Sequence, residues 1–257
     1  MQSIFYRIGT AQQSLSLLLV WNVLFLKKNS EDSNVQRLSD FFEIRPGVTA
    51  LIGGGGKTST MYALAEELRK KGSVIVSTST HILRPPQYPY LPRLVEKLQI
   101  GEVVSTGTVD GTKLSTPEQS FSELIGYADY VLVEADGSRQ LPLKAHASHE
   151  PVIPPEANTV LVVIGIDGLG KPIKETAHRP KLYAEICGAS VDDIVTEETI
   201  RTVVSTYPRC DGIVINKADD ETQTARAESL AEQFSVPVAI TAWQAEHPIK
   251  AYRRAEP

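Results

Sequence analysis

Short apolar runs alternate along the chain with segments of helical periodicity. The runs are nearly continuous in hydrophobicity, which is typical of strands that a parallel sheet buries on both faces. They span residues 48–52, 74–76, 130–133, 159–166, 211–215 and 238–240. Helices are predicted at 58–71, at 116–127 and in the segment that carries Ala227, Leu230, Ala231 and Phe234 on one face. Gly72 is expected to end the first helix, and the proline-rich stretch 85–92 is expected to be a loop.

This alternation predicts an α/β fold with an open, doubly wound, mostly parallel sheet. Ligands bind such sheets at the carboxyl ends of the strands, so polar residues that follow the apolar runs are the candidate site. The chain has 257 residues, 42% of them hydrophobic, which is enough to form one domain of this class.

Charge and cysteine content narrow the functional classes. The chain carries 26 basic and 31 acidic residues and has no basic block, so nucleic acid and anionic membranes are not expected as partners. Cys187 and Cys210 are too few for a disulfide framework and lack zinc-type spacing. These features favour a reducing, cytoplasmic location.

The segment 15–26 (LSLLLVWNVLFL) is the longest apolar run. It is too short to span a bilayer, which needs about 20 residues, so no stable membrane insertion is expected. It resembles the apolar core of a signal peptide, but lysines follow it instead of a small-residue cleavage site. A surface-docked helix is the other alternative. We interpret residues 1–34 as an N-terminal appendage from a start codon placed too far upstream, and 35–257 as the domain.

A glycine-rich loop lies between the first predicted strand and the first predicted helix. It comprises Gly53, Gly54, Gly55, Gly56, Lys57 and Thr58. Glycine amides can surround an anion, and the helix N-terminus adds partial positive charge. Lys57 is expected to reach the β- and γ-phosphates, and Thr58 to ligate magnesium. This pattern predicts a sheet of P-loop NTPase type. The usual loop begins with glycine where this chain has Leu51, and a chance glycine turn is the alternative.

The acidic stretch Glu134-Ala135-Asp136-Gly137 ends the YVLV strand. A carboxylate delivered beside a phosphate loop can hold magnesium and orient the attacking water. Glu134 and Asp136 both remain candidates for this role. The spacing E-x-x-G resembles the switch motif of metal-centre assembly GTPases, which implies that the Gly137 amide contacts the γ-phosphate. The alternative is a solvated acidic turn.

A third stretch, Asn216-Lys217-Ala218-Asp219, follows the DGIVI strand, where small GTPases carry N-K-x-D. Asp219 can accept two hydrogen bonds from guanine, Lys217 can lie along the base, and Asn216 can brace the loop. Thr241-Ala242 follows the next strand, where GTPases place the small residues that contact guanine O6. The alternative is a helix cap with Asp219 at the N-cap position.

Weaker clusters lie in other loops. Thr78 to His81 follow the second strand, and His81 is a candidate for proton transfer. Lys144, His146, His149 and Glu150 occupy a charged loop that is interpreted as a switch or lid. Residues 165–171 and 177–180 surround a possible second substrate or partner site, in which Arg179 has no evident partner from the sequence.

Together these stretches resemble one family. LIGGGGKTST, VLVEADGSRQLPLKAHASHEPVIP, VIGIDGLGKPI with AHRP, and INKAD occur in the order found in the selenium-dependent hydroxylase accessory proteins (YqeC-type). The resemblance covers roughly residue 35 to the end. It implies a role in the maturation of selenium-containing molybdenum hydroxylases, with such an enzyme or its cofactor as partner.

The sequence thus favours a P-loop NTPase that uses Mg²⁺ with GTP rather than ATP and acts as an assembly factor. An ATP-dependent ligase or small-molecule kinase is the first alternative, because GGGGKTST resembles the GTNGKT loop of Mur-type ligases. A non-catalytic module that binds nucleotide or molybdopterin is the second.

Overall fold

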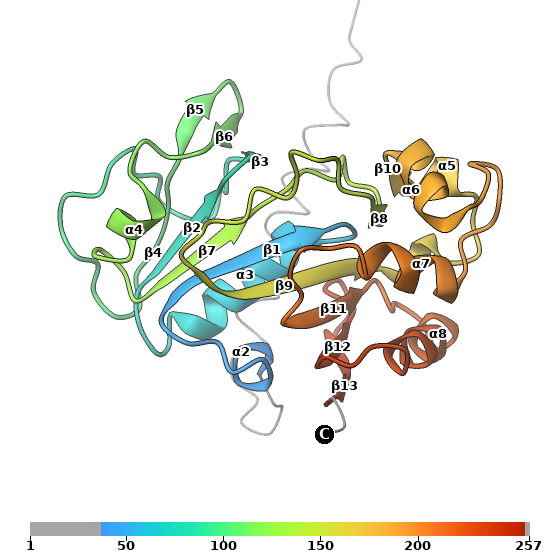
Figure 1. The fold of residues 1–257 in the computed structure, drawn as a ribbon. Coiled ribbons are helices and arrows are strands. Elements are labelled where there is room, and N and C mark those ends of the chain that lie inside the picture. The colour runs from blue at the N-terminus through green and yellow to red at the C-terminus, as the bar shows by residue number, and fades with distance from the viewer. Residues whose placement is uncertain (1–36, 255–257) are drawn as a thin grey trace, which may run out of the picture. The chain divides into compact units, whose positions relative to one another are not determined.

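The computed structural model describes residues 37–254, and the predicted appendage 1–34 with its apolar run lies outside this range (Figure 1). An eight-stranded sheet forms the centre, in the order β13-β12-β11-β9-β1-β7-β2-β4. Its strands are β1 Gly47–Gly53, β2 Val74–Thr78, β4 Val103–Ser105, β7 Tyr130–Glu134, β9 Ala157–Gly165, β11 Gly212–Asn216, β12 Val238–Thr241 and β13 Ile249–Arg253. Neighbouring strands are parallel except β12 and β13. The α/β fold with a largely parallel sheet is therefore confirmed.

The continuous apolar runs are explained by burial on both faces of the sheet. Side chains alternate between faces along a strand, so neighbours in sequence enter different cores. In β1, Ala50 and Ile52 join one hydrophobic cluster, whereas Leu51 joins the other. Most positions that face a helix layer are then apolar, which removes the polar alternation of a one-sided sheet.

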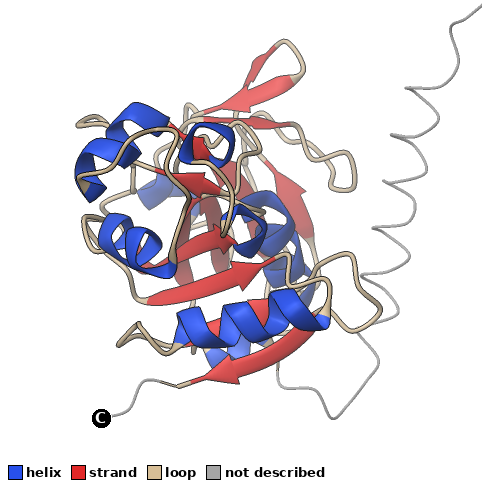
Figure 2. Ribbon diagram, turned by 90° about the vertical axis from the view of Figure 1, so that its right-hand side faces the viewer, coloured by secondary structure: helices blue, strands red, loops and turns tan. Residues whose placement is uncertain are grey.

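Helices cover both faces of the sheet (Figure 2). Buried residues of α2 (Leu38–Phe41) and α3 (Lys57–Leu68) belong to one cluster. Buried residues of four other helices belong to the second cluster. These helices are α4 Phe121–Leu124, α6 Pro180–Cys187, α7 Glu197–Val204 and α8 Glu221–Ala231. The doubly wound arrangement follows from this division. No helix in the described range is long and apolar enough to cross a membrane.

The order in which strands are added to the sheet reverses at β1. The earlier strands β2, β4 and β7 lie on one side of it, and β9 and all later strands lie on the other. Crevices form at the carboxyl end of such a switch strand because the connections leave it in opposite directions. The loop from β1 to α3 lies at this point.

The predicted helix at 116–127 was too long, since α4 is a single turn. Gln119 bonds the backbone of Leu94 through both its amide oxygen and its amide nitrogen, at 2.7 and 3.1 Å, which ties the preceding residues to another loop. Ser120 and Glu123 then form a capping box that starts the helix.

Smaller elements were not predicted. A three-stranded antiparallel sheet contains β3 His81–Leu83, β6 Lys113–Ser115 and β5 Thr108–Asp110. A short parallel pair joins β8 Leu143–Lys144 to β10 Ala177–His178. The remaining turns are η1 Ile166–Gly168 and α5 Ile173–Thr176. The β8–β10 pair matters most for the site, because it joins two loops that are far apart in the sequence.

Candidate functional site

The glycine loop connects β1 to α3 and is packed tightly against neighbouring backbone. Gly55 has a φ of 75°, and a Cβ there would lie 2.2 Å from the Gly165 nitrogen. A Cβ on Gly54 would lie 2.7 Å from the Leu141 carbonyl oxygen. Such distances exclude any side chain, so the glycines are required for close approach as well as for backbone conformation.

Three amides of this loop already have partners. The N–H of Gly53 donates to Asp136 Oδ2 at 2.8 Å, that of Gly54 to the Val163 carbonyl at 2.9 Å, and that of Gly55 to the Leu141 carbonyl at 3.0 Å. The donors left to an incoming anion are the orphan amides of the first turn of α3, which carries the positive end of the helix dipole. The candidate anion site is therefore centred on the start of α3.

Lys57 is the first residue of α3, and its side chain is buried. Its ammonium donates to the Gly53 carbonyl at 2.7 Å and lies 2.9 Å from Asp136 Oδ1 and 3.7 Å from Glu134 Oε1. Burial alone would lower the pKa of Lys57, but the two carboxylates outweigh it and raise the pKa. Lys57 is thus charged and faces the end of β7.

Glu134 and Asp136 face different partners. Glu134 Oε2 accepts from the Thr58 hydroxyl at 2.7 Å, and burial raises the pKa of Glu134 despite Lys57. Asp136 is fully buried and lies 2.5 Å from Nε2 of His146 through Oδ2. Burial would raise the pKa of Asp136, but Lys57, His146 and Lys144 together hold it well below its usual range. Glu134 is consequently the carboxylate beside Thr58, and Asp136 is the counter-ion of Lys57.

The Asn216–Asp219 stretch adjoins the glycine loop. The buried Asn216 donates through Nδ2 to the Gly55 carbonyl at 2.8 Å and accepts through Oδ1 from the Thr241 hydroxyl at 3.1 Å. Lys217 has a φ of 67°, and its ammonium lies 2.9 Å from Asp167 Oδ2. The Asn216 side chain therefore links the glycine loop after β1 to the carboxyl ends of β11 and β12.

Asp219 is exposed and does not cap α8. The N-cap is Asp220, whose side chain accepts from the Gln223 amide at 2.7 Å. The alternative that assigned the cap to Asp219 was wrong by one residue, because the turn needs one more residue before the helix begins. The Asp219 carboxylate is left available at the edge of the site.

A partly buried ionic group lies beside Asp136. It consists of Lys144, Glu150 and Arg179, and we refer to it as the Lys144 cluster. The Lys144 ammonium donates to the Gly137 carbonyl at 2.6 Å and lies 3.1 Å from Glu150 Oε1 and 3.7 Å from Asp136 Oδ2. Arg179 donates to Glu150 Oε2 through Nε at 3.1 Å and Nη2 at 2.9 Å. Arg179, which had no evident partner in the sequence, is thus paired with a residue 29 positions away.

Burial is the largest influence on the charges of this cluster. It lowers the pKa of Lys144, and Asp136 and Glu150 offset this only in part. It would raise the pKa of Glu150, but Arg179 and Lys144 outweigh it and lower that pKa. Perturbed titratable groups are enriched in functional sites, although ionic networks of purely structural role also perturb pKa values.

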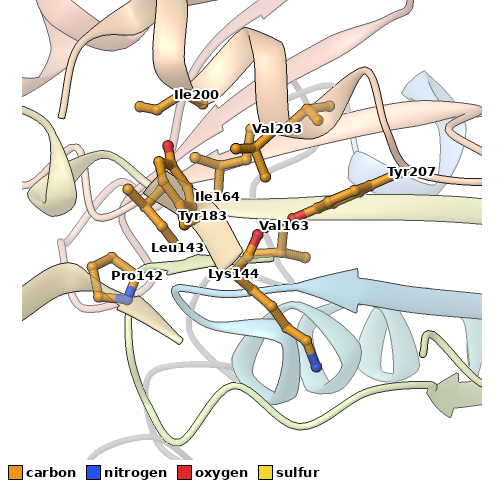
Figure 3. Close-up of a pocket in the computed structure, with 10 residues that line it drawn as sticks. Pro142, Leu143, Lys144, Val163, Ile164, Tyr183, Ile200, Val203 and Tyr207 are labelled. Atoms are coloured by element: carbon orange, nitrogen blue, oxygen red, sulfur yellow. Dashed lines mark hydrogen bonds between the residues drawn. The ribbon is translucent and has the colours of Figure 1, made fainter. Parts of the chain in front are cut away.

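A small gap lies on the other side of Lys144 (Figure 3). Tyr183, Ile200, Val203 and Tyr207 are among its lining residues, and it has room for about one water molecule. The Tyr207 hydroxyl donates to the Lys144 carbonyl at 2.7 Å. Figure 3 shows the Lys144 side chain pointing out of this gap toward β1 and α3, so the gap is a packing space and not the candidate site.

The structure does not bring every candidate together. His81 lies on β3 with 57% of its side chain exposed, 3.7 Å from Asp110. In the described range, no hydrogen bond or ion pair joins it to Lys57 or Glu134. His149 is exposed, and Cys187 and Cys210 are free thiols. No group of three or more metal-ligating side chains forms within residues 37–254.

Some contacts were missed from the sequence. His146 was noted as a loop histidine, but its bond to Asp136 and its ring contact with Tyr207, with centroids 4.2 Å apart, were not foreseen. The pairing of Asp167 with Lys217 was also missed. The partners are separated by 10 to 61 residues, and no local spacing rule relates them.

Comparison with known proteins places this geometry in a family. The model of the YqeC protein family matches residues 49–181, more than half of the chain. The chain belongs to the YqeC family. The matched range includes the glycine loop, β7 and the Lys144 cluster, and it ends before Asn216.

A relative in this family is a protein of Escherichia coli (strain K12) named "Uncharacterized protein YqeC". It is 35% identical over 166 residues, which cover 58% of this chain and 63% of the relative. The alignment therefore spans less than two thirds of the relative's length, and its name supplies no activity.

Proposed function

We propose that this YqeC-family protein binds and hydrolyses a guanine nucleoside triphosphate, as a P-loop NTPase. The observation that carries the proposal is the position of Asn216, which bonds both the Gly55 carbonyl and the Thr241 hydroxyl. A nucleotide must reach from a phosphate site to a base site, and here one buried side chain fixes the distance between the two candidate loops.

The phosphate end is formed by the start of α3. The orphan amides of its first turn supply donors, and Lys57 supplies a charge that is shared with the phosphates once it turns away from Asp136 and Glu134. The carbonyls of Leu141 and Val163 keep the Gly55 and Gly54 amides occupied. The β- and γ-phosphates are therefore expected over Gly56, Lys57 and Thr58.

Magnesium fits the pair formed by Thr58 and Glu134. A hydroxyl and a carboxylate 2.7 Å apart suit an ion that takes few protein ligands and completes its shell with phosphate and water. Magnesium would neutralise phosphate charge there. Asp136 is less suited, because its oxygens already face Lys57, the Gly53 amide and His146.

The base end is formed by Lys217, Asp219 and the loop after β12. The exposed Asp219 carboxylate can accept from both guanine donors, N1–H and the 2-amino group. The Ala218 amide donates to the Thr241 carbonyl at 3.1 Å, which holds the two loops together around the space for the base. Adenine offers no donor at N1, so this arrangement favours guanine.

Isothermal titration calorimetry tests the proposal with GTP, ATP and molybdopterin dinucleotides, each with and without magnesium. Saturable, magnesium-dependent binding of GTP that is at least about tenfold tighter than that of ATP supports it. Preference for ATP with a modified small-molecule product would favour a ligase or kinase instead. Tight binding of a molybdopterin nucleotide without turnover would favour a non-catalytic module.

The biological role proposed from the family resemblance is maturation of selenium-dependent molybdenum hydroxylases in the cytoplasm. Deletion of the gene should lower the activity of such a hydroxylase and spare selenium-independent ones. Loss of both activities, or of neither, contradicts the role and leaves the nucleotide proposal to be judged by calorimetry.

A further inference from the structure

The turn that follows the acidic stretch has an unusual backbone. The Leu141 amide donates to the Ser138 carbonyl at 3.0 Å, and the two central residues, Arg139 and Gln140, have φ values of 51° and 63°. Turns with two positive φ values normally carry glycine, asparagine or aspartate at these positions. Non-glycine residues in this region are strained, and such strain collects at ligand clamps and catalytic loops.

This turn is attached to the candidate site at both ends. The carbonyl of Gly137 accepts from Lys144, and the carbonyl of Leu141 accepts from the Gly55 amide of the phosphate loop. Arg139 is two residues from each attachment, so its Cα lies within about 7 Å of both, given at most about 3.6 Å per residue. An arginine side chain is long enough to cross that distance.

Arg139 differs from the charged residues that line the site. The carboxylates of Glu134, Asp136 and Glu150 are matched by the cations of Lys57, Lys144 and Arg179. Arg139 is exposed, and nothing within residues 37–254 forms a hydrogen bond or ion pair with it. The buried carboxylates and cations of the site already neutralise one another. The exposed Arg139 guanidinium is therefore available to the negative charge that a triphosphate adds.

We propose that Arg139 is a catalytic residue that contacts the γ-phosphate during hydrolysis and stabilises the charge of the transition state. This inference rests on the proposed function. In the step, the water oxygen forms a bond to Pγ while the bond from Pγ to the bridging oxygen breaks. The electron pair of that bond stays on GDP, one proton of the water stays on the released phosphate, and the other passes to solvent. A guanidinium supplied at this point accelerates such reactions about 10³- to 10⁵-fold.

Three variants separate charge from backbone effects. Arg139→Asn removes the guanidinium but keeps a residue that tolerates positive φ, so the turn should be preserved. Arg139→Lys keeps the charge without the planar fork. Arg201→Gln, on the exposed side of α7, removes a positive charge outside the candidate site. Single-turnover hydrolysis at saturating GTP and the Kd for GTP are measured for each, with the thermal unfolding midpoint as a check of folding.

We expect Arg139→Asn to lower the single-turnover rate at least about tenfold while the Kd for GTP changes less than about threefold. Arg139→Lys should fall between it and the wild type, and Arg201→Gln should match the wild type. A wild-type rate in Arg139→Asn overturns the inference and leaves the proposed function standing. An equal loss of rate and affinity also overturns it, since the contact would then be made in the ground state. No binding of GTP by the wild type rejects the proposed function and this inference together.

Discussion

Lys57 and Lys144 are both buried lysines that face Asp136, at 2.9 and 3.7 Å, yet they are positioned in different ways. Lys57 comes directly after the glycines, and its place follows from the loop and the start of α3. Lys144 is held by Gly137, Glu150 and, through Glu150, by Arg179, which comes from another loop. The position of Lys57 follows from local sequence, although its partners Glu134 and Asp136 come from the distant end of β7. The Lys144 cluster needs Arg179 from a separate loop.

The difference bears on what each lysine does. Lys57 is the first residue of α3, and an anion at the N-terminus of a helix is stabilised by the first-turn amides and the dipole. Both ammonium groups contact two carboxylates and a carbonyl oxygen, but Lys144 lies on the short strand β8 and not at the N-terminus of a helix. We infer that Lys57 serves phosphate, whereas Lys144 holds the loop from Gly137 to Glu150 in place.

The sharpest test of this difference is the stability of Lys144→Met. Removing the cation leaves two buried carboxylates short of a partner, and breaking a buried pair costs about 3–5 kcal/mol. Glu150 keeps Arg179 and Asp136 keeps Lys57, so we expect about 3 kcal/mol of lost unfolding free energy by denaturant titration. Lys174→Met, which breaks an exposed ion pair with Asp192, should leave the unfolding free energy nearly unchanged. Equal losses of unfolding free energy in the two variants would show that the ion pairs of Lys144 stabilise the protein no more than an exposed ion pair does.

Lys57→Ala tests the other half of the comparison. It removes a charge-assisted contact worth about 1.5–3 kcal/mol, so GTP affinity measured by calorimetry should fall at least about tenfold. Circular dichroism should show a folded protein, and Lys174→Ala should bind GTP as the wild type does. Unchanged affinity in Lys57→Ala would remove the phosphate site from the start of α3.

The same difference explains what could be predicted from the sequence. Six of the eight strands of the central sheet and the glycine loop were predicted, because buried parallel strands need continuous apolar runs and the loop needs its glycines at fixed positions. The two edge strands, β4 and β13, were not predicted. The short helix α4 was overestimated, because Gln119 is bound to Leu94, 25 residues away. The Lys144 cluster could not be assembled, because no periodicity or spacing connects Glu150 with Arg179. In the sequence, its members are recognisable only as separate charged residues of two loops.

The proposed base site is intermediate between the glycine loop, which the sequence predicts, and the Lys144 cluster, which it does not. Asp219→Asn tests this base site. A carboxylate that accepts from both guanine donors is replaced by a group with one donor, and an unpaired polar group costs about 1–3 kcal/mol. GTP binding should weaken about tenfold, and xanthosine triphosphate, whose carbonyl at position 2 can accept from the new amide, should bind more tightly. Asp220→Asn is the matched control, because asparagine still caps α8 and lies outside the base site. A silent Asp219→Asn, with equal binding of GTP and ATP, would reject the guanine site.

The smallest expected effect is the pH dependence that Glu150 contributes to stability. Arg179 and Lys144 hold its pKa below the usual value of a glutamate, against the opposing effect of burial. A carboxylate with a depressed folded-state pKa stabilises the protein above its unfolded-state pKa, and this stability is lost as the pH falls through the folded-state value. The wild type should therefore lose unfolding free energy as the pH falls below about 4.5, and Glu150→Gln should lose less over that range because residue 150 no longer titrates. Urea titrations at intervals between about pH 3 and 7 measure both profiles, with the exposed Glu228→Gln on α8 as a control that keeps the wild-type shape. Parallel profiles for the wild type and Glu150→Gln would mean that the ion pairs of Glu150 with Lys144 and Arg179 do not favour its charged form. The Lys144 cluster would then be held by packing and hydrogen bonds to Gly137 rather than by charge.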